Sequence, residues 1–396
     1  MGKYFYPLVR NPYRQKDISK AINVLKSFKL TSGKITRKFQ NSFTKKIKTN
    51  FSLMVNSGSS ANLLAFQCLI NPYRKKRLKP GDEVLIPALC WSTSLWPIVQ
   101  CGLKPKFVDI EKETLNFDLN DLEKKISNKT KAIMIVHVLG NSVDMDKLLQ
   151  IKKKYNLVLV EDTCESLGTK YKKKFLGTFG EFSSFSFYSS HQISSGEGGM
   201  ICCNNKNDYE IINSLKAHGW SRGLKNEKKI ARENQHLDSR FIFYNSGFNL
   251  RSTDIAASIA HSQFQDLEKF IKIRSWNRDK IVNQLKNNKK INYKIKAIEA
   301  NKNVRASWFG IPLILSKEIN KKKFIDKLEK KGIETRPVIS GNFLKQPSIK
   351  KYKLGKKEKM KNSEFVGKNG FFIGLPNQKI SNKMLVRLIS IIEKSF

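Results

Sequence analysis

One internal stretch lacks lysine, although lysine is abundant in the rest of the chain. No lysine lies between Lys174 and Lys206, which excludes a lysine amine as a reactive group in that stretch. Residues 182–203 of it read FSSFSFYSSHQISSGEGGMICC. This pattern predicts a short apolar strand, a polar loop that carries His191, a glycine-rich turn and a second strand at 200–203.

Acidic residues are scarce: Asp and Glu number 33 against 75 Lys and Arg, so the formal net charge is +42. A nucleic-acid-binding protein concentrates such charge in a patch or tail with interleaved aromatics. Here lysine is spread over nearly every predicted helix, with asparagine alongside, as in KEINKKKFIDKLEKKG. We therefore interpret the charge as a compositional bias and expect no nucleic-acid partner. The charge would nevertheless attract an anionic substrate such as a nucleotide sugar.

Cysteine is also scarce, and long apolar runs are missing. The six cysteines form no CxxC pair and none follows Cys203, so paired-cysteine metal or redox motifs are excluded. Most lie in apolar segments, which is typical of small buried side chains in a reducing cytoplasm. No apolar run approaches membrane-spanning length, and MGKYFYPLVRNPYRQKD at the start lacks the apolar core of a signal peptide. We expect a cytoplasmic protein with no membrane partner.

Apolar runs alternate with helical segments through the first half of the chain. Strands are predicted within the segments 53–55, 83–86, 104–110, 129–140 and 157–162. Their Val- and Ile-rich runs favour parallel strands that are buried on both faces, and the strand–helix order predicts an α/β layer with its ligand at the carboxyl ends of the strands. We expect a large α/β domain over 1–265, including a helical segment at 12–50. A Lys- and Asn-rich hinge region at 265–300 would lead into a smaller α+β domain over 266–396.

Local chemistry marks candidate ligand positions at the ends of these strands. The turn NSGSS precedes a helix, so backbone N–H groups at Gly58 and Ser59 are suited to a phosphate, although such turns are often simple N-caps. Trp91 and Asp162 both fall at the carboxyl ends of predicted strands. Standing alone, Trp91 would be a packing aromatic and Asp162 a helix cap.

The motifs, taken in order and spacing, resemble the DegT-type sugar aminotransferases, which are fold-type I pyridoxal-phosphate enzymes. The matching motifs are NSGSSANLL, PALCWSTS, VEDTCESLG, GTFGEFSSFSFY, GEGGM and GFNLRSTDIAA. The resemblance extends from about Leu30 to the C-terminus. It implies a three-layer α/β/α domain with a mixed seven-stranded sheet, followed by a smaller α+β domain.

The resemblance also implies which residues hold pyridoxal 5′-phosphate or pyridoxamine 5′-phosphate. Gly58, Ser59 and Ser186 would bind its phosphate. Asn249 would reach the phosphate bound by the partner subunit, which implies a homodimer with shared active sites.

Three further residues are assigned to the pyridine ring by the same resemblance. Trp91 would stack on the ring. Asp162 would pair with the ring nitrogen and keep it protonated, so that the ring accepts electrons. Glu165 would lie near the O3′ atom.

His191 is the position at which the chain departs from the aminotransferases. The family has there the lysine that tethers the cofactor, whereas a subset, the pyridoxamine-phosphate-dependent sugar 3-dehydratases, resembles this chain in having histidine. Imidazole cannot form the tethering imine, so the cofactor would be held without a covalent bond. Histidine can still act as acid or base. Gln192 departs from a second histidine that is common in the subset.

Two types of dehydratase share this histidine. One acts on a CDP-linked sugar and carries cysteines for an iron–sulfur cluster after the histidine; from Asn204 to Phe396 this chain has no cysteine, so we expect no cluster. The other acts on GDP-4-keto-6-deoxy-D-mannose, and its pattern resembles AHGWSRG, SWFG and GIETRPVISGNFLK. The resemblance implies a hydro-lyase that removes the C3 hydroxyl of this sugar, with L-glutamate as amino donor. Its product would be a 4-keto-3,6-dideoxy sugar on the route to colitose, a lipopolysaccharide O-antigen sugar.

Four residues are candidates for binding the substrate: His218, Arg222, Glu334 and Arg336. His218 would position the sugar or share proton transfer, and Arg222 would bind a carboxylate or diphosphate, for which its planar fork is suited. The alternatives are a nucleotide-sugar aminotransferase that uses a lysine from elsewhere, a dehydratase of a CDP-linked sugar, and an inactive binding protein on the same fold.

Overall fold

A mixed sheet of seven strands, in the order β1-β9-β8-β5-β4-β2-β3, forms the centre of the protein. The computed structural model describes residues 4–355 and 358–396. The strands of this sheet are β1 (Phe51–Val55), β2 (Glu83–Pro87), β3 (Lys104–Val108), β4 (Thr130–Val136), β5 (Val158–Asp162), β8 (Phe182–Ser186) and β9 (Gly199–Cys203). From β3 to β8 neighbouring strands run parallel, whereas β9 and β1 are antiparallel to their neighbours. The predicted α/β layer is confirmed, with strand ends displaced by a few residues.

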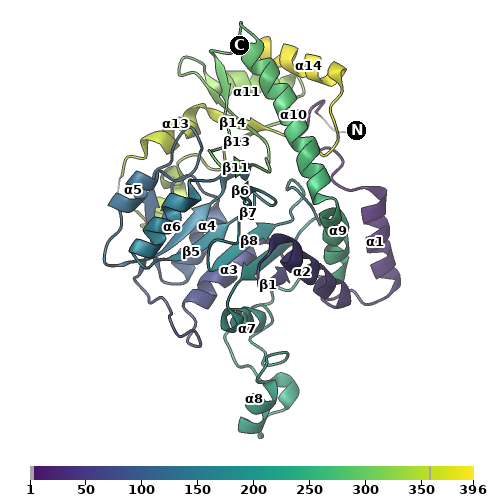
Figure 1. Ribbon diagram of the computed structural model, residues 1–396, viewed down its shortest axis with the longest axis vertical. Helices are drawn as coiled ribbons and strands as arrows, with labels where there is room; N and C mark the ends of the chain where they lie inside the picture. Colours follow the sequence, from purple (N-terminus) through teal and green to yellow (C-terminus); the bar gives the residue numbers. More distant parts are fainter. Residues whose placement is uncertain (1–3, 356–357) are drawn as a thin grey trace.

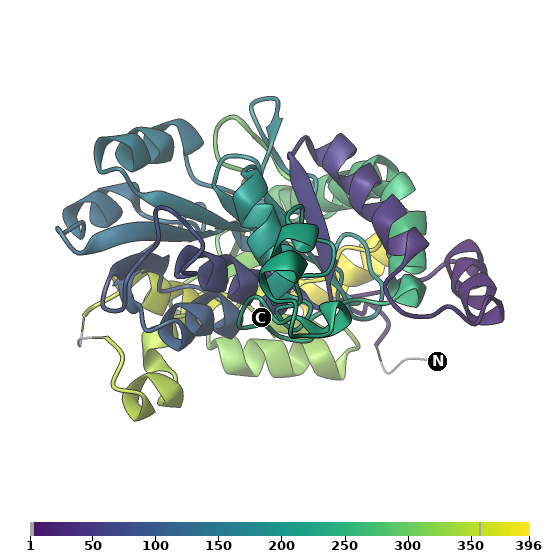
Figure 2. The same cartoon turned by 90° about the horizontal axis from the view of Figure 1, so that it is seen from below.

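Helices cover both faces of this sheet (Figure 1, Figure 2). One layer contains α3 (Gly58–Leu69), α4 (Ser92–Gln100) and α7 (Lys206–Leu215), and the other contains α5 (Leu119–Lys124), α6 (Met145–Lys154), α2 (Lys34–Ile47) and α9 (Asp254–Gln265). Val84 and Ile86 of β2 pack into the first layer, and Leu85 between them packs into the second. Strands covered in this way have no solvent-facing side, which explains their continuous apolar runs.

A second, antiparallel sheet of four strands lies above the first in Figure 1. It consists of β10 (Ile295–Ala297), β12 (Ile311–Leu315), β14 (Gly370–Ile373) and β13 (Thr335–Pro337), covered by α11 (Lys321–Lys330) and α14 (Asn382–Glu393). Its hydrophobic core is separate from those of the large sheet and includes Tyr6, whose hydroxyl donates to the carbonyl of Gly374 at 3.0 Å. We propose that this core defines the smaller domain, with a boundary near residue 266 and with the residues around Tyr6 attached to it.

Several further elements are short. They are β6 (Lys170–Tyr171), β7 (Lys174–Phe175), β11 (Val304–Arg305), α8 (Glu227–Glu233), α12 (Pro347–Lys351), α13 (Lys361–Asn369) and the 3-10 turns η1 (Val138–Gly140), η2 (Ser239–Phe241) and η3 (Phe343–Lys345). Figure 1 shows α8 projecting below the body of the molecule, on a small apolar cluster of its own. Within residues 4–355 and 358–396, no helix combines the length and the apolar character needed to cross a lipid bilayer.

The six cysteines are all free thiols; five are buried and Cys164 is partly exposed. Burial raises the pKa of the Cys101 and Cys202 thiols to about 12. Because the charged thiolate is disfavoured at such a pKa, these side chains behave as small apolar groups. Their interpretation as small buried side chains is confirmed.

Helix α10 (Leu267–Asn287) occupies most of the predicted hinge region. It begins beside α9 and ends next to α14, so it runs from the large sheet to the smaller core (Figure 1). Its buried face includes Ile271, Ile281 and Leu285. Apolar residues at helical spacing therefore produce a continuous helix where the Lys- and Asn-rich composition suggested a hinge.

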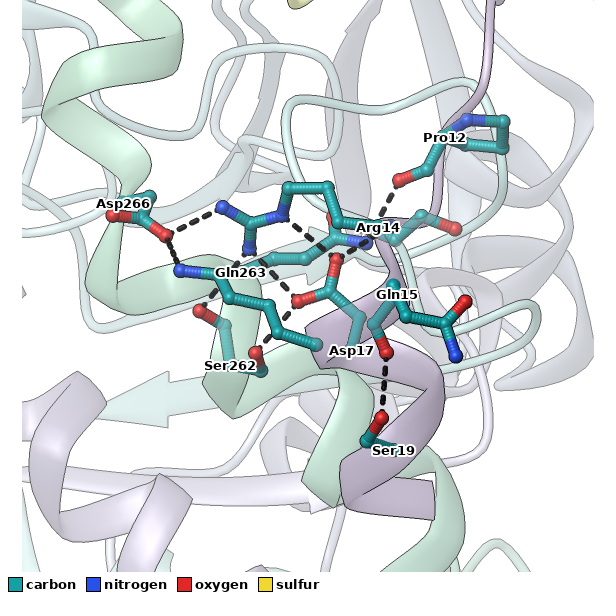
Figure 3. A network of polar contacts seen from close by, with 10 residues as sticks. Pro12, Arg14, Gln15, Asp17, Ser19, Ser262, Gln263 and Asp266 are labelled. Carbon is teal, nitrogen blue, oxygen red and sulfur yellow. Dashed lines mark hydrogen bonds and ion pairs between the residues drawn. The ribbon is translucent and has the colours of Figure 1, made fainter. Parts of the chain in front are cut away.

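The predicted N-terminal helical segment forms α1 (Gln15–Lys26) and α2. Figure 3 shows how α1 is fastened to the end of α9, with the guanidinium of Arg14 between the carboxylates of Asp17 and Asp266. The Nη2 atom of Arg14 lies 2.8 Å from an Asp17 oxygen. The amide nitrogen of Gln263 on α9 also donates to the backbone just before α1, at 2.9 Å. Residues 12–17 are therefore fixed against α9.

Helix α2 is capped by a side chain that is distant in sequence. Its own N-cap residue is Gly33, which has no side chain to accept a hydrogen bond. The carboxylate of Asp254, in the first turn of α9, accepts instead from the backbone N–H groups of Gly33, Ile35 and Thr36 at 2.8, 3.1 and 2.9 Å, and from the Thr36 hydroxyl at 2.6 Å. Burial acts to raise the pKa of Asp254, but these hydrogen bonds outweigh it and lower the pKa. One carboxylate thus joins the two helices.

We expect the substitution Asp254→Ala to lower the free energy of unfolding by about 2–4 kcal/mol, because four donors lose a charged acceptor. Since the folded pKa lies below the unfolded value of 3.8, this stabilisation is present above that value and is lost as the pH falls through the folded pKa. Denaturant titrations from neutral pH to below 3.8 measure both effects. Asp238→Ala, which removes an exposed carboxylate paired with Arg240, is the control, and equal stability of the two variants would contradict the capping role.

Candidate active site

Most of the predicted cofactor residues converge where β5 and β8 end and where α3 and α4 begin. Asp162 is the last residue of β5, Ser186 is the last of β8, and Gly58 is the first of α3. A Cβ atom on Gly58 would lie 2.9 Å from the Cβ of Ser186 and 2.6 Å from the Sγ of Cys164. Only glycine therefore allows the start of α3 to pack so closely on the end of β8.

The first turn of α3 presents backbone donors to the site. The Ser57 hydroxyl caps this helix by accepting from the N–H of Ser60 at 3.1 Å. The N–H groups of Gly58 and Ser59 have no acceptor within the helix, because no turn precedes them. With the hydroxyl of Ser186 beside them, they form a cradle suited to an anion at the positive end of the helix dipole.

The carboxylate of Asp162 is held in one orientation by side chains from two helices. Its Oδ2 atom accepts from the Asn62 amide of α3 at 2.9 Å and from the Ser94 hydroxyl of α4 at 2.8 Å. Its Oδ1 atom accepts from the backbone N–H of Cys164 at 3.1 Å. The roles of Asn62 and Ser94 were not predicted, although both lie inside motifs that carry the family resemblance.

Trp91 presents its indole to the open side of the site. It is the N-cap residue of α4 and is 60% exposed, unlike the aromatic residues of the core. The carbonyl of the preceding residue, Cys90, accepts from the hydroxyl of Ser340 at 2.7 Å, which fixes the backbone. An exposed aromatic face on a fixed backbone is suited to stacking on a planar ligand.

His191 lies in the loop between β8 and β9, as predicted. The residue keeps a partly exposed edge, but its Nδ1 atom is buried and has no hydrogen-bond partner among the described residues. The ring of Phe309 meets the imidazole edge to face, with 5.0 Å between the ring centres. The loop is anchored from α9, because the N–H of Ser194 donates to the Gln263 amide oxygen at 2.8 Å.

Burial lowers the pKa of His191 to about 4. A hydrogen bond with the backbone of Tyr188 and the charge of Asp162 oppose this effect, whereas the charge of Arg274 adds to it. The imidazole is therefore neutral at physiological pH and able to accept a proton.

The pKa of Glu165 is shifted in the opposite direction, upward. Its Oε2 atom accepts from the N–H of Leu139 at 2.8 Å. Burial raises its pKa to about 7, the Leu139 hydrogen bond opposes this, and the charge of Asp162 adds to it. Near neutral pH the carboxyl group therefore exchanges a proton easily, which is suited to an acid–base role.

Gln192 links Glu165 to the smaller domain. Its amide nitrogen donates to the carbonyl of Glu165 at 2.6 Å and to the carbonyl of Ser307 at 2.9 Å. Its amide oxygen is buried and has no partner within the described residues. The sequence indicated only that Gln192 departs from a histidine; the structure places it as a connector between two chain segments.

Three predicted residues form a separate group around Trp220. His218 has φ +60°, and its Nε2 atom lies 3.2 Å from an Nη2 atom of Arg251. The Asn249 amide oxygen accepts from Arg251 at 3.3 Å, and the guanidinium of Arg222 lies 5.1 Å from the centre of the Trp220 ring. His218, Arg222 and Asn249 contact Trp220, Arg240 and Arg251, and among the described residues none of the three contacts Asp162 or His191.

Glu334 and Arg336 form a third group at the start of β13. Their side chains pair at 3.0 Å. The other carboxylate oxygen of Glu334 accepts from the N–H of Leu8 at 2.9 Å. These contacts connect the pair to the N-terminal segment and leave the Arg336 side chain about half exposed.

Residues 12–385 match the DegT/DnrJ/EryC1/StrS aminotransferase family. The chain belongs to this family. GDP-4-keto-6-deoxy-D-mannose 3-dehydratase of Escherichia coli O55:H7 is 34% identical over 374 residues, which cover 93% of this chain and 95% of that protein. The family resemblance inferred from the motifs is confirmed.

Solved structures of related enzymes have the same fold. Escherichia coli GDP-4-keto-6-deoxy-D-mannose-3-dehydratase with bound hydrated PLP superposes with a TM-score of 0.90 at 32% identity, over 99% of each chain. Two further structures of GDP-4-keto-6-deoxymannose-3-dehydratase share this score and identity and cover 98% of this chain and 100% of theirs. One is a histidine-to-asparagine mutant with bound GDP-perosamine, and the other holds a trapped PLP–glutamate geminal diamine. The predicted fold-type I architecture is confirmed.

We expect Glu165→Gln to change how stability depends on pH, because Gln retains an oxygen for Leu139 but cannot ionise. With a folded pKa of about 7 against 4.5 in the unfolded chain, the folded wild-type protein binds more protons between these values. The stability of the wild-type protein therefore falls as the pH rises through that interval. The Glu165→Gln variant should lose less stability over the same interval. Denaturant titrations of cofactor-free protein at several pH values measure this; Glu113→Gln, at an exposed position, is the control. Equal slopes for the wild type and Glu165→Gln would contradict a raised pKa.

Proposed function

We propose that the chain is a pyridoxamine-phosphate-dependent 3-dehydratase of GDP-4-keto-6-deoxy-D-mannose. It would replace the C3 hydroxyl by hydrogen, with L-glutamate as the amino donor, and yield a 4-keto-3,6-dideoxy sugar. The observation that carries the proposal is the neutral imidazole of His191 in a lysine-free loop beside Asp162. The relatives in the same family that carry this activity in their names cover nearly the whole chain.

The residues at the ends of β5 and β8 fit a phosphorylated pyridine cofactor. The cradle at Gly58 and Ser59 offers donors for a dianionic phosphate, and the side chain of Ser186 adds a hydroxyl. Asp162 offers a fixed carboxylate to a protonated ring nitrogen, and Trp91 offers an exposed ring face. Pyridoxamine phosphate, when bound, supplies an amine that binds the sugar ketone and a ring that accepts electrons.

The protein side chains in this proposal hold the reactants and move protons. His191 accepts and returns the proton at the carbon that carries the cofactor amine, because its imidazole is neutral. Glu165, with its pKa of about 7, exchanges a proton with the ring hydroxyl at O3′. Asp162 remains an acceptor toward the ring nitrogen, held by Asn62 and Ser94.

The groups around Trp220 and β13 are candidates for the substrate. Arg222 and Arg251 flank the Trp220 ring, and no carboxylate pairs with either among the described residues. Such cations are suited to a diphosphate, and His218 beside them to a sugar hydroxyl. Glu334 and Arg336 would bind the remaining polar groups of the nucleotide sugar.

A homodimer would bring the Trp220 group to a second active site. Asn249 is exposed in the protomer and does not contact the cradle of its own chain. Helix α1, which stands out at one side in Figure 2, exposes Ile18, Ile22 and Leu25 at helical spacing. An apolar stripe of this kind is suited to a protein interface, and a second copy would also place Asn249 near the partner's phosphate.

The products of one assay test this function. The protein is incubated with pyridoxal phosphate, L-glutamate and GDP-4-keto-6-deoxy-D-mannose, and in parallel with a CDP-linked 4-keto-6-deoxy sugar. We expect one ammonia and one 2-oxoglutarate for each GDP-linked dideoxy sugar formed. A GDP-linked amino sugar would instead identify an aminotransferase, and turnover of the CDP-linked sugar alone would identify a different substrate.

Substitutions at position 191 test the proton transfer. His191→Asn should lower the rate roughly a hundredfold to ten-thousandfold, because it removes the general base while leaving the binding residues in place. Cofactor binding, measured by absorbance, should persist. His191→Lys should tether the cofactor covalently, which changes its absorbance spectrum. His236→Asn at an exposed position is the control; wild-type rates in His191→Asn would refute the role.

A further inference from the structure

A short segment of the smaller domain, residues 307–309, packs against the catalytic loop, and we call it the bracing segment. It carries Phe309, whose ring contacts the imidazole of His191 with 5.0 Å between ring centres. We propose that Arg274 is a positioning residue for His191, because its guanidinium fixes the backbone from which Phe309 supports the imidazole. The inference rests on the proposed role of His191 as the base.

Nearly every backbone N–H and carbonyl group of the bracing segment forms a hydrogen bond with a residue outside the segment. The N–H and carbonyl of Ser307 bond to the Thr169 hydroxyl and the Gln192 amide, each at 2.9 Å. The N–H of Phe309 donates to the carbonyl of Leu139 at 3.0 Å. The other two carbonyls, of residues 308 and 309, accept from Arg274 at 3.0 and 2.5 Å. Removing Arg274 would therefore leave the carbonyls of residues 308 and 309 without their donors and loosen the backbone that carries the Phe309 ring.

Arg274 also connects the bracing segment to the chain at residues 375–377. Its Nη1 atom donates to the carbonyl of Leu375 at 2.6 Å and to the Asn377 side chain at 3.2 Å. Arg274, Leu375 and Asn377 line one small cavity together with His191. The guanidinium thus lies next to the catalytic loop.

The charge of Arg274 is not neutralised. It is 4% exposed, and in the described part of the chain no carboxylate lies within ion-pair distance of it. Burial lowers its pKa to about 10, and the interaction with Tyr6 opposes this effect, so the guanidinium remains charged at neutral pH. A buried cation without a counter-ion costs stability, which favours a function for the charge as well as for the hydrogen bonds.

That charge acts on the imidazole. The charged or titratable groups that face His191 are Asp162 from β5, Tyr188 of the same loop, Arg10 in the cavity wall and Arg274 from α10. Arg274 repels a protonated imidazole and so lowers the pKa of His191, whereas Asp162 acts in the opposite direction. The cation therefore helps to keep the base neutral.

Arg278, one turn further along α10, provides a matched comparison. It is 5% exposed, similar to Arg274. Its guanidinium pairs with Glu299 at 2.7 Å and stacks on the ring of Trp308, so its charge is neutralised and it does not line the cavity beside His191. If an effect came only from the loss of a buried arginine from α10, substitutions at positions 274 and 278 should both produce it.

The test measures the protonation of His191 in cofactor-free protein. The chain has five histidines, so NMR of histidine-labelled protein resolves them, and His191→Asn assigns the signal. We expect Arg274→Gln to raise the titration midpoint of His191, Arg274→Lys to keep it near the wild-type value, and Arg278→Gln to leave it unchanged. This readout does not require the proposed reaction, so its failure and the failure of the function are distinguishable.

Rates in the complete assay test the positioning. Arg274→Lys keeps the charge but loses the planar fork, and Phe309→Leu removes the ring without changing any charge. Both should lower kcat about tenfold to a hundredfold with little change in KM, and Arg278→Gln should not. If Arg274→Gln does not fold, these two variants still decide the question. Midpoints and rates that respond alike at positions 274 and 278 would overturn the proposal.

Discussion

The contact between the start of α3 and the end of β8 determines how the site is built. A Cβ atom on Gly58 would lie only 2.9 Å from the Ser186 Cβ, so glycine allows the close packing that places the free N–H groups of the first turn at the end of the sheet. The same helix then carries Asn62, four residues later, to the Asp162 carboxylate. A larger residue at position 58 would displace both the phosphate cradle and the Asn62 side chain that bonds to Asp162, because both belong to the same helix.

Burial shifts the pKa values of His191 and Glu165 in opposite directions. It lowers the pKa of His191 and raises that of Glu165, so that at neutral pH the imidazole is uncharged and the carboxyl group is close to its midpoint. Asp162 is fixed instead by three donors. One site thus contains a base, a proton-exchanging acid and a carboxylate held in place by hydrogen bonds, which is a division of roles suited to proton transfer between carbon and oxygen atoms.

Sequence reasoning identified the residues that lie inside contiguous motifs. The strand ends, the glycine turn, Trp91 and His191 were predicted because local patterns, order and spacing specify them. Asn62 and Ser94 lie in those motifs but were missed, since their function is a hydrogen bond to a strand about 70 to 100 residues away. The Lys- and Asn-rich composition of residues 265–300 indicated a hinge, and helix α10 occupies most of that region.

The sequence by itself determined the family, the α/β layer and the replacement of the tethering lysine by an imidazole, because these depend on residue identity and on order along the chain. Only the tertiary structure decided the protonation state and the position of that imidazole. Its pKa depends on burial and on charges from β5 and α10, and its position depends on Phe309, which is distant from it in the sequence. Electrostatic and packing interactions act through space, so no local pattern around His191 contains them.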